Sequence, residues 1–369
     1  MTGLRSTLGK LVGGATVEID GAPPADLSVA PDSPDQIAKL LDFASEHGLT
    51  VLPWGSGRHQ GFGGRIDPDV IVSTSRLAGI SEWLPDDLTV VMGSGTTLGV
   101  LHDDISTRRQ SAILPETSPN ATIGGVIATG VSGWRRLRYG PTRDRLLQVE
   151  FVTGDGRVVT GGARVVKNVT GYDLPRLLTG SLGSLGIITS VCLKLWPVPE
   201  ASATVATDDP DRALAVTHRP QAVLETADGV SVYLAGTAAE VEAQAAAVGG
   251  DITTGHSWPD QPAGECVVRI RVMPVDVSSV VASLDGHSFV AAHGVGEVVG
   301  AIDPSEIEGL RERAEERGGA VVIERAPATV YDEIDPWGAP PATIDLQRRI
   351  KAAFDPLNVL VAGRLPGNI

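Results

Sequence analysis

A glycine-rich segment that follows a short apolar run is the first part of this sequence that suggests chemistry. It reads Pro53-Trp-Gly-Ser-Gly-Arg-His-Gln-Gly-Phe-Gly-Gly64, and the residues at 50–52 predict a strand before it. Backbone N–H groups in such a loop can surround a phosphate. The segment is not a P-loop, because Gly-Lys-Ser/Thr is absent, and Gly55-x-Gly57 lacks the third glycine of a dinucleotide fingerprint. We therefore expect an anion-binding loop of another kind.

Glycine is concentrated in the same part of the chain. Of the 44 glycines, 22 lie between Gly55 and Gly186, where they alternate with short β-branched runs. This pattern is typical of a fold in which loops between strands hold a ligand through main-chain amides. A loop-rich β fold without a ligand would show the same excess, so further motifs must decide between the two.

The charge balance excludes one large class of partner. The 369 residues carry 30 basic and 45 acidic side chains, a net charge of −15, which argues against nucleic acid as the main partner. Residues 131–199 reverse the trend, with 10 basic and 4 acidic side chains. This basic stretch indicates an anionic ligand or acidic partner, or else a solvated basic face.

The cysteine and histidine content argues against several kinds of metal site, and the hydropathy argues against a membrane span. Two cysteines cannot build a disulfide framework or a four-thiolate iron–sulfur cluster, and the seven scattered histidines show no zinc-hydrolase spacing. We expect no metal site in this chain. No apolar run reaches the ~18–20 residues of a membrane span, and no signal peptide is visible, so a cytoplasmic location without membrane insertion is expected.

Regular elements are expected around the glycine loop. Apolar spacing between Ser33 and Gly48 predicts a helix over residues 34–47. Strands are predicted at 70–73, 88–92 and 187–195, a helix at 98–106, and a hairpin at 147–153 and 157–160. The Trp196-Pro-Val-Pro199 segment predicts a domain boundary.

The second half of the chain predicts a layered α+β domain. Its expected strands are 203–207, 229–235, 265–272, 293–300 and 320–324, and its expected helices are 210–216, 238–248, 275–284 and 304–317. A further helix at 344–353 follows a Pro-rich stretch. We therefore divide the chain into an N-terminal segment (1–24), a ligand-binding domain (25–199), a cap or substrate domain (200–330) and a C-terminal segment (331–369) returning to the first domain.

Further motifs follow the glycine loop in a fixed order. They are Pro115-Glu-Thr-Ser-Pro-Asn-Ala-Thr-Ile-Gly-Gly-Val126, Arg138-Tyr-Gly140, Lys167-Asn-Val-Thr-Gly-Tyr-Asp-Leu174 and Gly180-Ser-Leu-Gly-Ser-Leu-Gly-Ile-Ile-Thr189. With the loop, this set resembles the FAD-binding domain of the vanillyl-alcohol oxidase/p-cresol methylhydroxylase (PCMH-type) flavoproteins. The resemblance covers about residues 25–200 and implies two α/β subdomains that bind FAD.

The resemblance also implies which residues hold FAD. The first loop would cradle the pyrophosphate, the Thr-Ile-Gly-Gly stretch would run under the flavin, and the last strand would contact adenine and ribose. The implied residues are Trp54, Gly55, Ser56, Gly57, Arg58, His59, Glu116, Thr117, Ala121, Thr122, Gly124, Gly125, Ala128, Gly130, Ser132, Arg138, Gly140, Gly186, Ile187 and Ile188.

Within this family the chain is most similar to the FAD-binding E subunits of bacterial glycolate oxidase. The similarity lies in Arg135–Gly140, Val165–Leu174, Asp335–Gly338 and Arg348–Pro356. It implies a complex with a larger flavoprotein subunit and an iron–sulfur subunit, which oxidises glycolate to glyoxylate and lies peripheral to the inner membrane through those partners.

The sequence departs from the family pattern at two places. The tail reads Leu360-Val-Ala-Gly-Arg364, where relatives have Leu-Asn-Pro-Gly-Arg. In the glycine loop, Trp54 and Arg58 replace the usual arginine and threonine. Relatives with histidine-linked FAD carry that histidine where Arg58 stands, and His59 is one step away. We therefore expect FAD to be bound non-covalently.

Oxidation of a small 2-hydroxy acid also needs a cation for the carboxylate and a base for the hydroxyl proton. Arg269 and Arg271 alternate with apolar residues on one predicted strand and would share a face, where they could bind a carboxylate. The alternative is a cap-domain surface paired with nearby acids. His293, on another predicted strand, is the candidate base, and the alternative is a half-buried structural histidine.

Three functions remain open. The chain can be the FAD-binding subunit of a glycolate oxidase-like complex that oxidises a 2-hydroxy acid. It can instead be a non-catalytic electron-relay or scaffold subunit, because the histidine cluster of larger glycolate-oxidising flavoproteins is absent. The third possibility is a stand-alone FAD-dependent oxidase of another alcohol or hydroxy acid.

Overall fold

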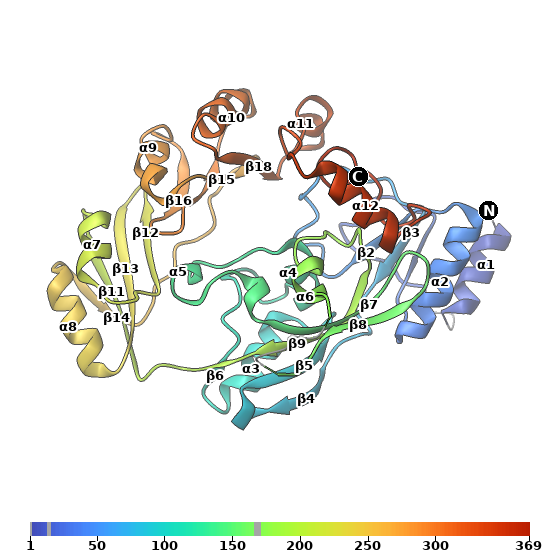
Figure 1. Cartoon of the computed structure of the whole chain (residues 1–369), viewed down its shortest axis with the longest axis horizontal. Helices are drawn as coiled ribbons and strands as arrows, with labels where there is room; N and C mark the ends of the chain where they lie inside the picture. The colour runs from blue at the N-terminus through green and yellow to red at the C-terminus, as the bar shows by residue number, and fades with distance from the viewer. Residues whose placement is uncertain (1, 13–15, 166–170) are drawn as a thin grey trace.

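A small parallel sheet organises the N-terminal part of the chain (Figure 1). In the computed structural model, which describes residues 2–12, 16–165 and 171–369, the strands lie in the order β1 (Leu27–Val29), β3 (Val70–Ser73) and β2 (Val51–Trp54). Helices α1 (Thr2–Leu11) and α2 (Pro34–His47) accompany it, and α2 buries its apolar face in the same core. Helix α2 ends at Gly48, whose φ of 64° lies in the left-handed region.

A five-stranded antiparallel sheet forms the second layer of this half. Its order is β4 (Ile80–Leu84), β5 (Thr89–Gly93), β9 (Ile187–Lys194), β7 (Leu146–Val152) and β8 (Val158–Gly162). Residues of α3 (Leu98–Ser106), α4 (Ile123–Thr129) and α6 (Leu174–Leu178) share its apolar core. The short strands β6 (Gln110–Ser111) and β10 (Trp196–Pro197) pair nearby, and α5 (Arg136–Tyr139) follows α4.

The second half of the chain builds an eight-stranded antiparallel sheet. Its order is β14 (Ile252–Thr254), β11 (Ala201–Thr207), β13 (Gly229–Gly236), β12 (Ala222–Thr226), β16 (Ser288–Ala292), β17 (Glu297–Ala301), β15 (Val267–Arg271) and β18 (Ala320–Arg325). Helices α7 (Pro210–Val216), α8 (Ala238–Val248), α9 (Val277–Val281) and α10 (Ile307–Glu315) pack on one face. Trp134 packs among residues of the other face, so that face is turned toward the first half.

The C-terminal segment packs against the first half (Figure 1). After α11 (Ala328–Glu333), helix α12 (Ile344–Phe354) places Ile350 and Phe354 against the core of the five-stranded sheet. The chain then adds to the edge of β2, where Val51 N–H donates to Val359 O at 2.8 Å and Val361 N–H donates to Val51 O at 3.1 Å. Short 3-10 turns lie at Pro85–Asp87, Thr142–Asp144, Pro274–Asp276 and Pro304–Glu306.

One predicted strand begins too early, and this affects a candidate site residue. Of the strand expected at 293–300, residues 297–300 belong to β17, whereas 293–296 form the turn between β16 and β17, in which Gly294 and Gly296 adopt φ values of 76° and 81°. His293 therefore follows the end of β16 instead of lying within a strand. By contrast, the helices predicted at 34–47, 98–106, 210–216 and 238–248 are confirmed with their bounds.

Candidate cofactor and substrate site

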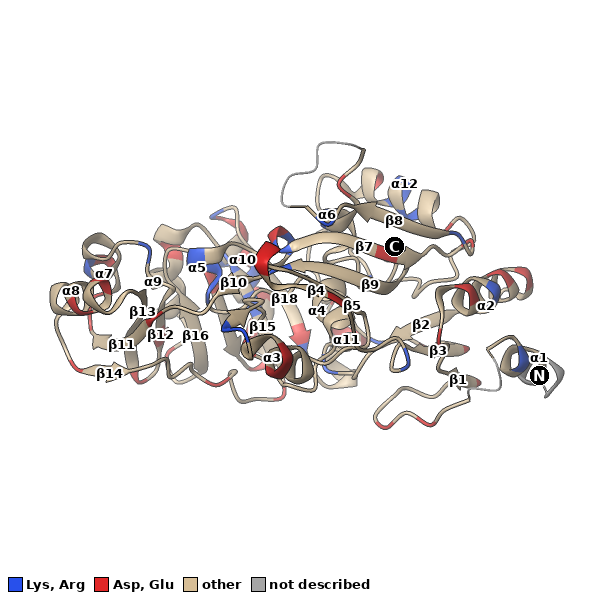
Figure 2. Ribbon diagram, turned by 90° about the horizontal axis from the view of Figure 1, so that it is seen from below, with Lys and Arg blue, Asp and Glu red and all other residues tan. Residues whose placement is uncertain are grey.

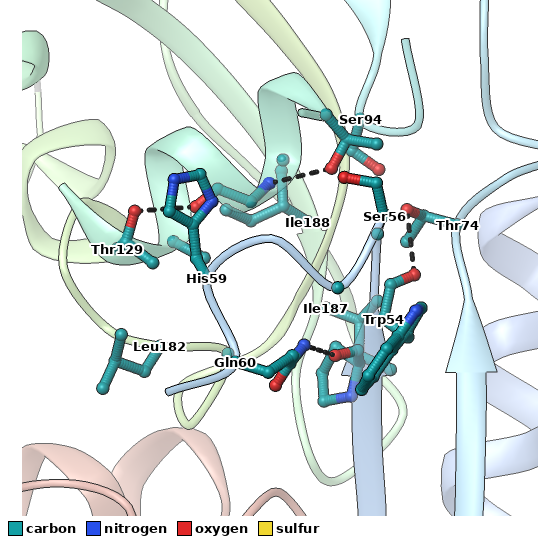
Figure 3. A pocket seen from close by; sticks show the side chains of 18 of the residues that line it. Trp54, Ser56, His59, Gln60, Thr74, Ser94, Thr129, Leu182, Ile187 and Ile188 are labelled. Atoms are coloured by element: carbon teal, nitrogen blue, oxygen red, sulfur yellow. Dashed lines mark hydrogen bonds between the residues drawn. The ribbon is translucent and has the colours of Figure 1, made fainter. Parts of the chain in front are cut away.

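The glycine loop leaves β2 and forms the wall of a narrow cavity (Figure 3). The loop crosses the N-terminal part of α4, and the turn before β9 completes the cavity. The local geometry requires glycine at Gly57, where φ is 73° and an added Cβ would lie 2.6 Å from the Trp54 ring. Trp54 itself is buried and anchors the loop to the parallel sheet.

The loop presents backbone donors that the protein does not use. The N–H groups of residues 55–60 donate to no backbone acceptor in the described part of the chain. Across the cavity, Ser94 Oγ is buried and has no hydrogen-bond partner among the described residues. Unused amides and a buried hydroxyl facing one cavity are the donor set that a phosphate group needs.

The charge around this cavity also suits an anion. Its lining contains Arg58, His59 and Arg364 and, among the described residues, no Asp or Glu. Although the whole chain carries a net charge of −15, this cavity has no lining carboxylate that would repel an anion. Arg58 is exposed, and burial lowers the pKa of His59 although Glu324 raises it.

The C-terminal segment holds this loop in place through Arg364. Its guanidinium donates to Phe62 O at 2.9 Å, to Gln60 Oε1 at 2.7 Å and to Gln60 O at 3.1 Å. The Arg364 side chain is almost fully buried, which lowers its pKa to about 10. Trp337 Nε1 donates to Arg364 O at 3.1 Å, so residues from the tail and the preceding segment fix the loop together.

A second cavity of about 250 Å³ adjoins the first and shares Gly57, Arg58, His59 and Gln60 with it. It lies between the glycine loop, the segments 115–117 and 131–134, and the face of the eight-stranded sheet on which helices α7–α10 do not pack. Its charged lining residues are Arg58, Glu116, Arg269, Glu324 and Arg325. Since one loop separates the two cavities, a ligand phosphate in the first would lie next to whatever occupies the second.

The residues predicted to hold FAD divide among these cavities. Thirteen line the first: Trp54, Gly55, Ser56, Gly57, Arg58, His59, Thr122, Gly124, Gly125, Ala128, Gly186, Ile187 and Ile188. Glu116, Thr117 and Ser132 line the second. Arg138 lines a separate cavity with Tyr139 and Trp196, and Ala121, Gly130 and Gly140 line neither of the first two. Residues 166–170, which include the start of the Lys167–Leu174 motif, lie outside the described residues.

The two candidate substrate arginines share one face of β15, as the alternation predicts. Both contact Glu297 on β17, and Arg269 also pairs with Glu324 on β18. Burial alone lowers the pKa of Arg269, but the two carboxylates raise it above its ordinary value. Arg269 lines the second cavity, whereas Arg271 does not. The charge of Arg269 is thus already compensated by acids of the chain itself.

Glu297 also joins the two halves of the molecule. Arg136 on α5 donates to Glu297 Oε2 at 2.9 Å, so three guanidiniums surround one buried carboxylate. Burial raises the pKa of Glu297, but Arg269, Arg271 and Arg136 together lower it below its usual value. In Figure 2, the basic segment of α5 lies beside the eight-stranded sheet.

Much of the basic stretch 131–199 is paired in this way. Arg135 contacts Glu116 at 2.5 Å, and Arg176 contacts Asp144 at 3.1 Å. Arg157 and Arg164 pair with Asp155 and Glu82. Internal acids therefore account for a large part of this charge, and the free basic groups of the first cavity come from other segments.

The candidate base lies elsewhere. His293 is buried, its Nε2 lies 2.6 Å from Glu225 Oε2, and it lines neither of the two cavities. The structure thus brings Arg269 and the glycine loop together at one cavity but does not bring His293 to them.

Sequence reasoning missed several residues of the two cavities. In the first these are Pro53, Gln60, Thr74, Ser94, Thr129, Leu182, Gly183 and Arg364. A usable signal for Arg364 was present, because the tail segment Leu360-Val-Ala-Gly-Arg364 keeps the Gly-Arg of the family pattern. In the second, Trp134, Glu324 and Arg325 carried no motif.

The described residues contain neither a cluster suited to a metal ion nor a helix suited to span a membrane. No group of three or more His, Cys, Asp or Glu side chains there is arranged to hold a metal ion. None of the helices in the described ranges has the length and apolar character needed to cross a bilayer.

Comparison with known proteins identifies the first domain. The family model described as FAD binding domain matches residues 25–162. The chain is 34% identical over 172 residues to the D-lactate dehydrogenase of Archaeoglobus fulgidus, which is 46% of this chain and 38% of that protein. It is 37% identical over 131 residues to the glycolate oxidase subunit GlcE of Escherichia coli, which is 34% of this chain and 37% of that subunit. The matched length is well under half of either relative.

Solved structures extend the likeness of the fold to most of the chain. Alkyldihydroxyacetonephosphate synthase superimposes with a TM-score of 0.64 over 91% of this chain and 75% of that one, at 15% identity. The fold is therefore α+β with an FAD-binding domain of the PCMH type, and FAD is its cofactor. The unused amides, the carboxylate-free lining and the buried Ser94 hydroxyl fit the pyrophosphate of that cofactor.

Proposed function

We propose that this chain is the FAD-binding subunit of a glycolate oxidase-like complex that oxidises a small 2-hydroxy acid, with glycolate as the lead substrate. The proposal includes a larger flavoprotein subunit and an iron–sulfur subunit as partners. Relatives named D-lactate dehydrogenase and glycolate oxidase subunit GlcE support it, since both names refer to enzymes of 2-hydroxy acids.

One observation carries the proposal. The phosphate-binding cavity and a second, arginine-containing cavity share the residues Gly57 to Gln60. A small acid in the second cavity would therefore lie beside the cofactor. When bound, FAD supplies the acceptor for the hydride that leaves the hydroxyl-bearing carbon.

The chain's own residues would bind and orient the acid. Arg269 pairs with Glu297 and Glu324, so a substrate carboxylate would exchange with these acids or share the guanidinium with them. The exposed Arg58 and Arg325 offer a contact to the same cavity without that exchange. Arg271 and His293 remain proposed participants, and both would have to act from outside the lining of this cavity.

Anaerobic titration of the FAD-loaded chain with a panel of 2-hydroxy acids tests the proposal. Glycolate, D-lactate and L-lactate should bleach the flavin absorbance to different extents, while a simple alcohol without a carboxylate should not. Arg325→Gln and Arg58→Gln should raise the acid concentration needed for half-bleaching. A chain that takes up FAD but is bleached by none of the acids contradicts the proposed oxidation.

An electron-relay or scaffold role is the second candidate, and the compensated charge of Arg269 favours it. In that case the partner subunit would oxidise the acid, and this chain would bind FAD and dock the partner. Stopped-flow mixing of the isolated chain with glycolate separates the two, because a relay subunit would be reduced only in the presence of its partner. Reduction of the isolated chain by a non-acidic alcohol would favour the third candidate, a stand-alone oxidase.

A further inference from the structure

His59 occupies an unusual position on the glycine loop. Its side chain lines both cavities, and it makes no hydrogen bond to another described residue. Figure 3 shows its imidazole projecting from the loop toward α4, and Nδ1 lies 3.7 Å from the point where a Cβ on Gly125 would stand. The imidazole is half-buried, and its ring nitrogens are accessible to a ligand that enters the cavity.

In the FAD-free protein, burial of the side chain is the main influence that favours the neutral form of His59. Burial is the largest influence and lowers its pKa, Glu324 on β18 raises it, and Arg269 on β15 lowers it. Arg58 on the same loop and Arg364 from the C-terminal segment add positive charge to the cavity lining. Because an ordinary histidine titrates near pH 6.5, the lowered pKa favours the neutral form of His59 at neutral pH.

The pyrophosphate of FAD changes this balance. It carries two negative charges that do not titrate near neutral pH, and it would lie in a cavity whose described lining holds no carboxylate. Arg364 directs three of its five N–H donors to Gln60 and Phe62, so much of its hydrogen-bonding capacity serves the loop itself. A dianion close to a half-buried imidazole favours the protonated form of that imidazole.

We propose that His59 takes up a proton when FAD binds and becomes a cationic contact of the pyrophosphate. The proton comes from the buffer, the neutral imidazole becomes imidazolium, and no bond of FAD changes. The inference rests on FAD binding and is independent of whether the chain oxidises a 2-hydroxy acid. It makes the affinity for FAD depend on pH through one identified residue.

Calorimetric titration of the FAD-stripped full chain tests this proposal. Measured in two buffers of different ionisation enthalpy at neutral pH, FAD binding should take up a net proton, approaching about one per FAD. The dissociation constant should weaken by up to about tenfold per pH unit above neutrality. ADP-ribose, which has the same pyrophosphate diester, should reproduce the uptake, and riboflavin, which has none, should not.

Variants assign the proton to His59. His59→Asn should bind FAD more weakly and show no buffer-dependent heat, whereas His59→Lys should bind FAD without uptake because its charge is already present. His218→Asn is the matched control, since His218 is exposed and lines neither cavity, and it should behave as the wild type.

The outcomes are distinguishable. FAD binding without net proton uptake in the wild type overturns the inference, as does uptake that persists in His59→Asn. Failure of the chain to bind FAD would instead overturn the cofactor assignment on which the proposed function depends. If His59→Asn does not fold, as judged by circular dichroism, the wild-type buffer comparison with ADP-ribose and riboflavin still decides.

Discussion

Arg364 donates hydrogen bonds to both the side-chain and the backbone oxygen of Gln60, at 2.7 Å and 3.1 Å, across 304 positions of sequence. The last residues of the chain therefore hold the loop that the first strands begin. We therefore predict that FAD binding depends on a segment outside the matched FAD-binding domain, which ends at residue 162.

Replacing Arg364 should loosen the loop. Arg364→Met keeps the apolar stem but leaves Gln60 O and Phe62 O without their donor, which should cost about 2–4 kcal/mol of stability and weaken FAD binding at least about tenfold. Thermal unfolding and fluorescence titration with FAD measure the two effects. Arg65→Met, at an exposed arginine near the same loop, should change neither quantity, and an equal effect there would contradict the assigned role.

Gly57 offers a test of the loop geometry itself. Gly57→Ala must accept a left-handed φ of 73° and a Cβ 2.6 Å from the Trp54 ring, whereas Gly21→Ala meets nearly the same φ, 72°, with nothing within 4 Å. Backbone strain of about 1–2 kcal/mol is common to both variants, and only Gly57→Ala adds the clash. Its Tm should therefore fall further, and its FAD affinity should drop while that of Gly21→Ala stays unchanged. Equal losses in the two variants would show that the ring contact is unimportant.

Glu297 should make the stability of the protein sensitive to acid. Its pKa is lowered in the folded state, so the stability it confers is present above the ordinary glutamate pKa and is lost as the pH falls through the lowered value. Glu297→Gln should cost about 3–5 kcal/mol at neutral pH, because three guanidiniums lose their shared carboxylate.

Urea unfolding at several pH values measures this effect. The variant should lose less stability than the wild type between neutral and acidic pH. Glu306→Gln, at a carboxylate that is 52% exposed, is the control and should follow the wild type. Parallel pH profiles for the wild type and Glu297→Gln would contradict the prediction.

His293→Asn separates a catalytic from a structural histidine. Because His293 pairs with Glu225 and lines neither cavity, we expect the variant to lose about 1–2 kcal/mol of stability and to keep the wild-type rate of flavin reduction. Pre-steady-state bleaching by the best 2-hydroxy acid measures that rate. A fall of about 100-fold or more, with a changed pH profile, would instead support His293 as the base.

The sequence pattern predicts most of the helices and strands of this protein. Helix α2 shows its apolar spacing, its Pro at the first turn and its terminal glycine within 15 residues, so local physics determines it. The turn at 293–296 was missed because Val295, Val298 and Val299 alternate with small residues as in one strand. The turn depends on positive φ values at Gly294 and Gly296, which this sequence pattern does not reveal.

The resemblance of the sequence to a flavoprotein family pointed to the glycine loop and to thirteen residues of the first cavity, which lie in a few contiguous segments. The folded structure was needed to show that Arg364 anchors the loop, that Glu297 contacts Arg136, Arg269 and Arg271, and that His293 lines neither of the two cavities. The physical reason is that buried charges and unused donors find partners by proximity in the folded chain, and strand order sets that proximity between residues far apart in sequence.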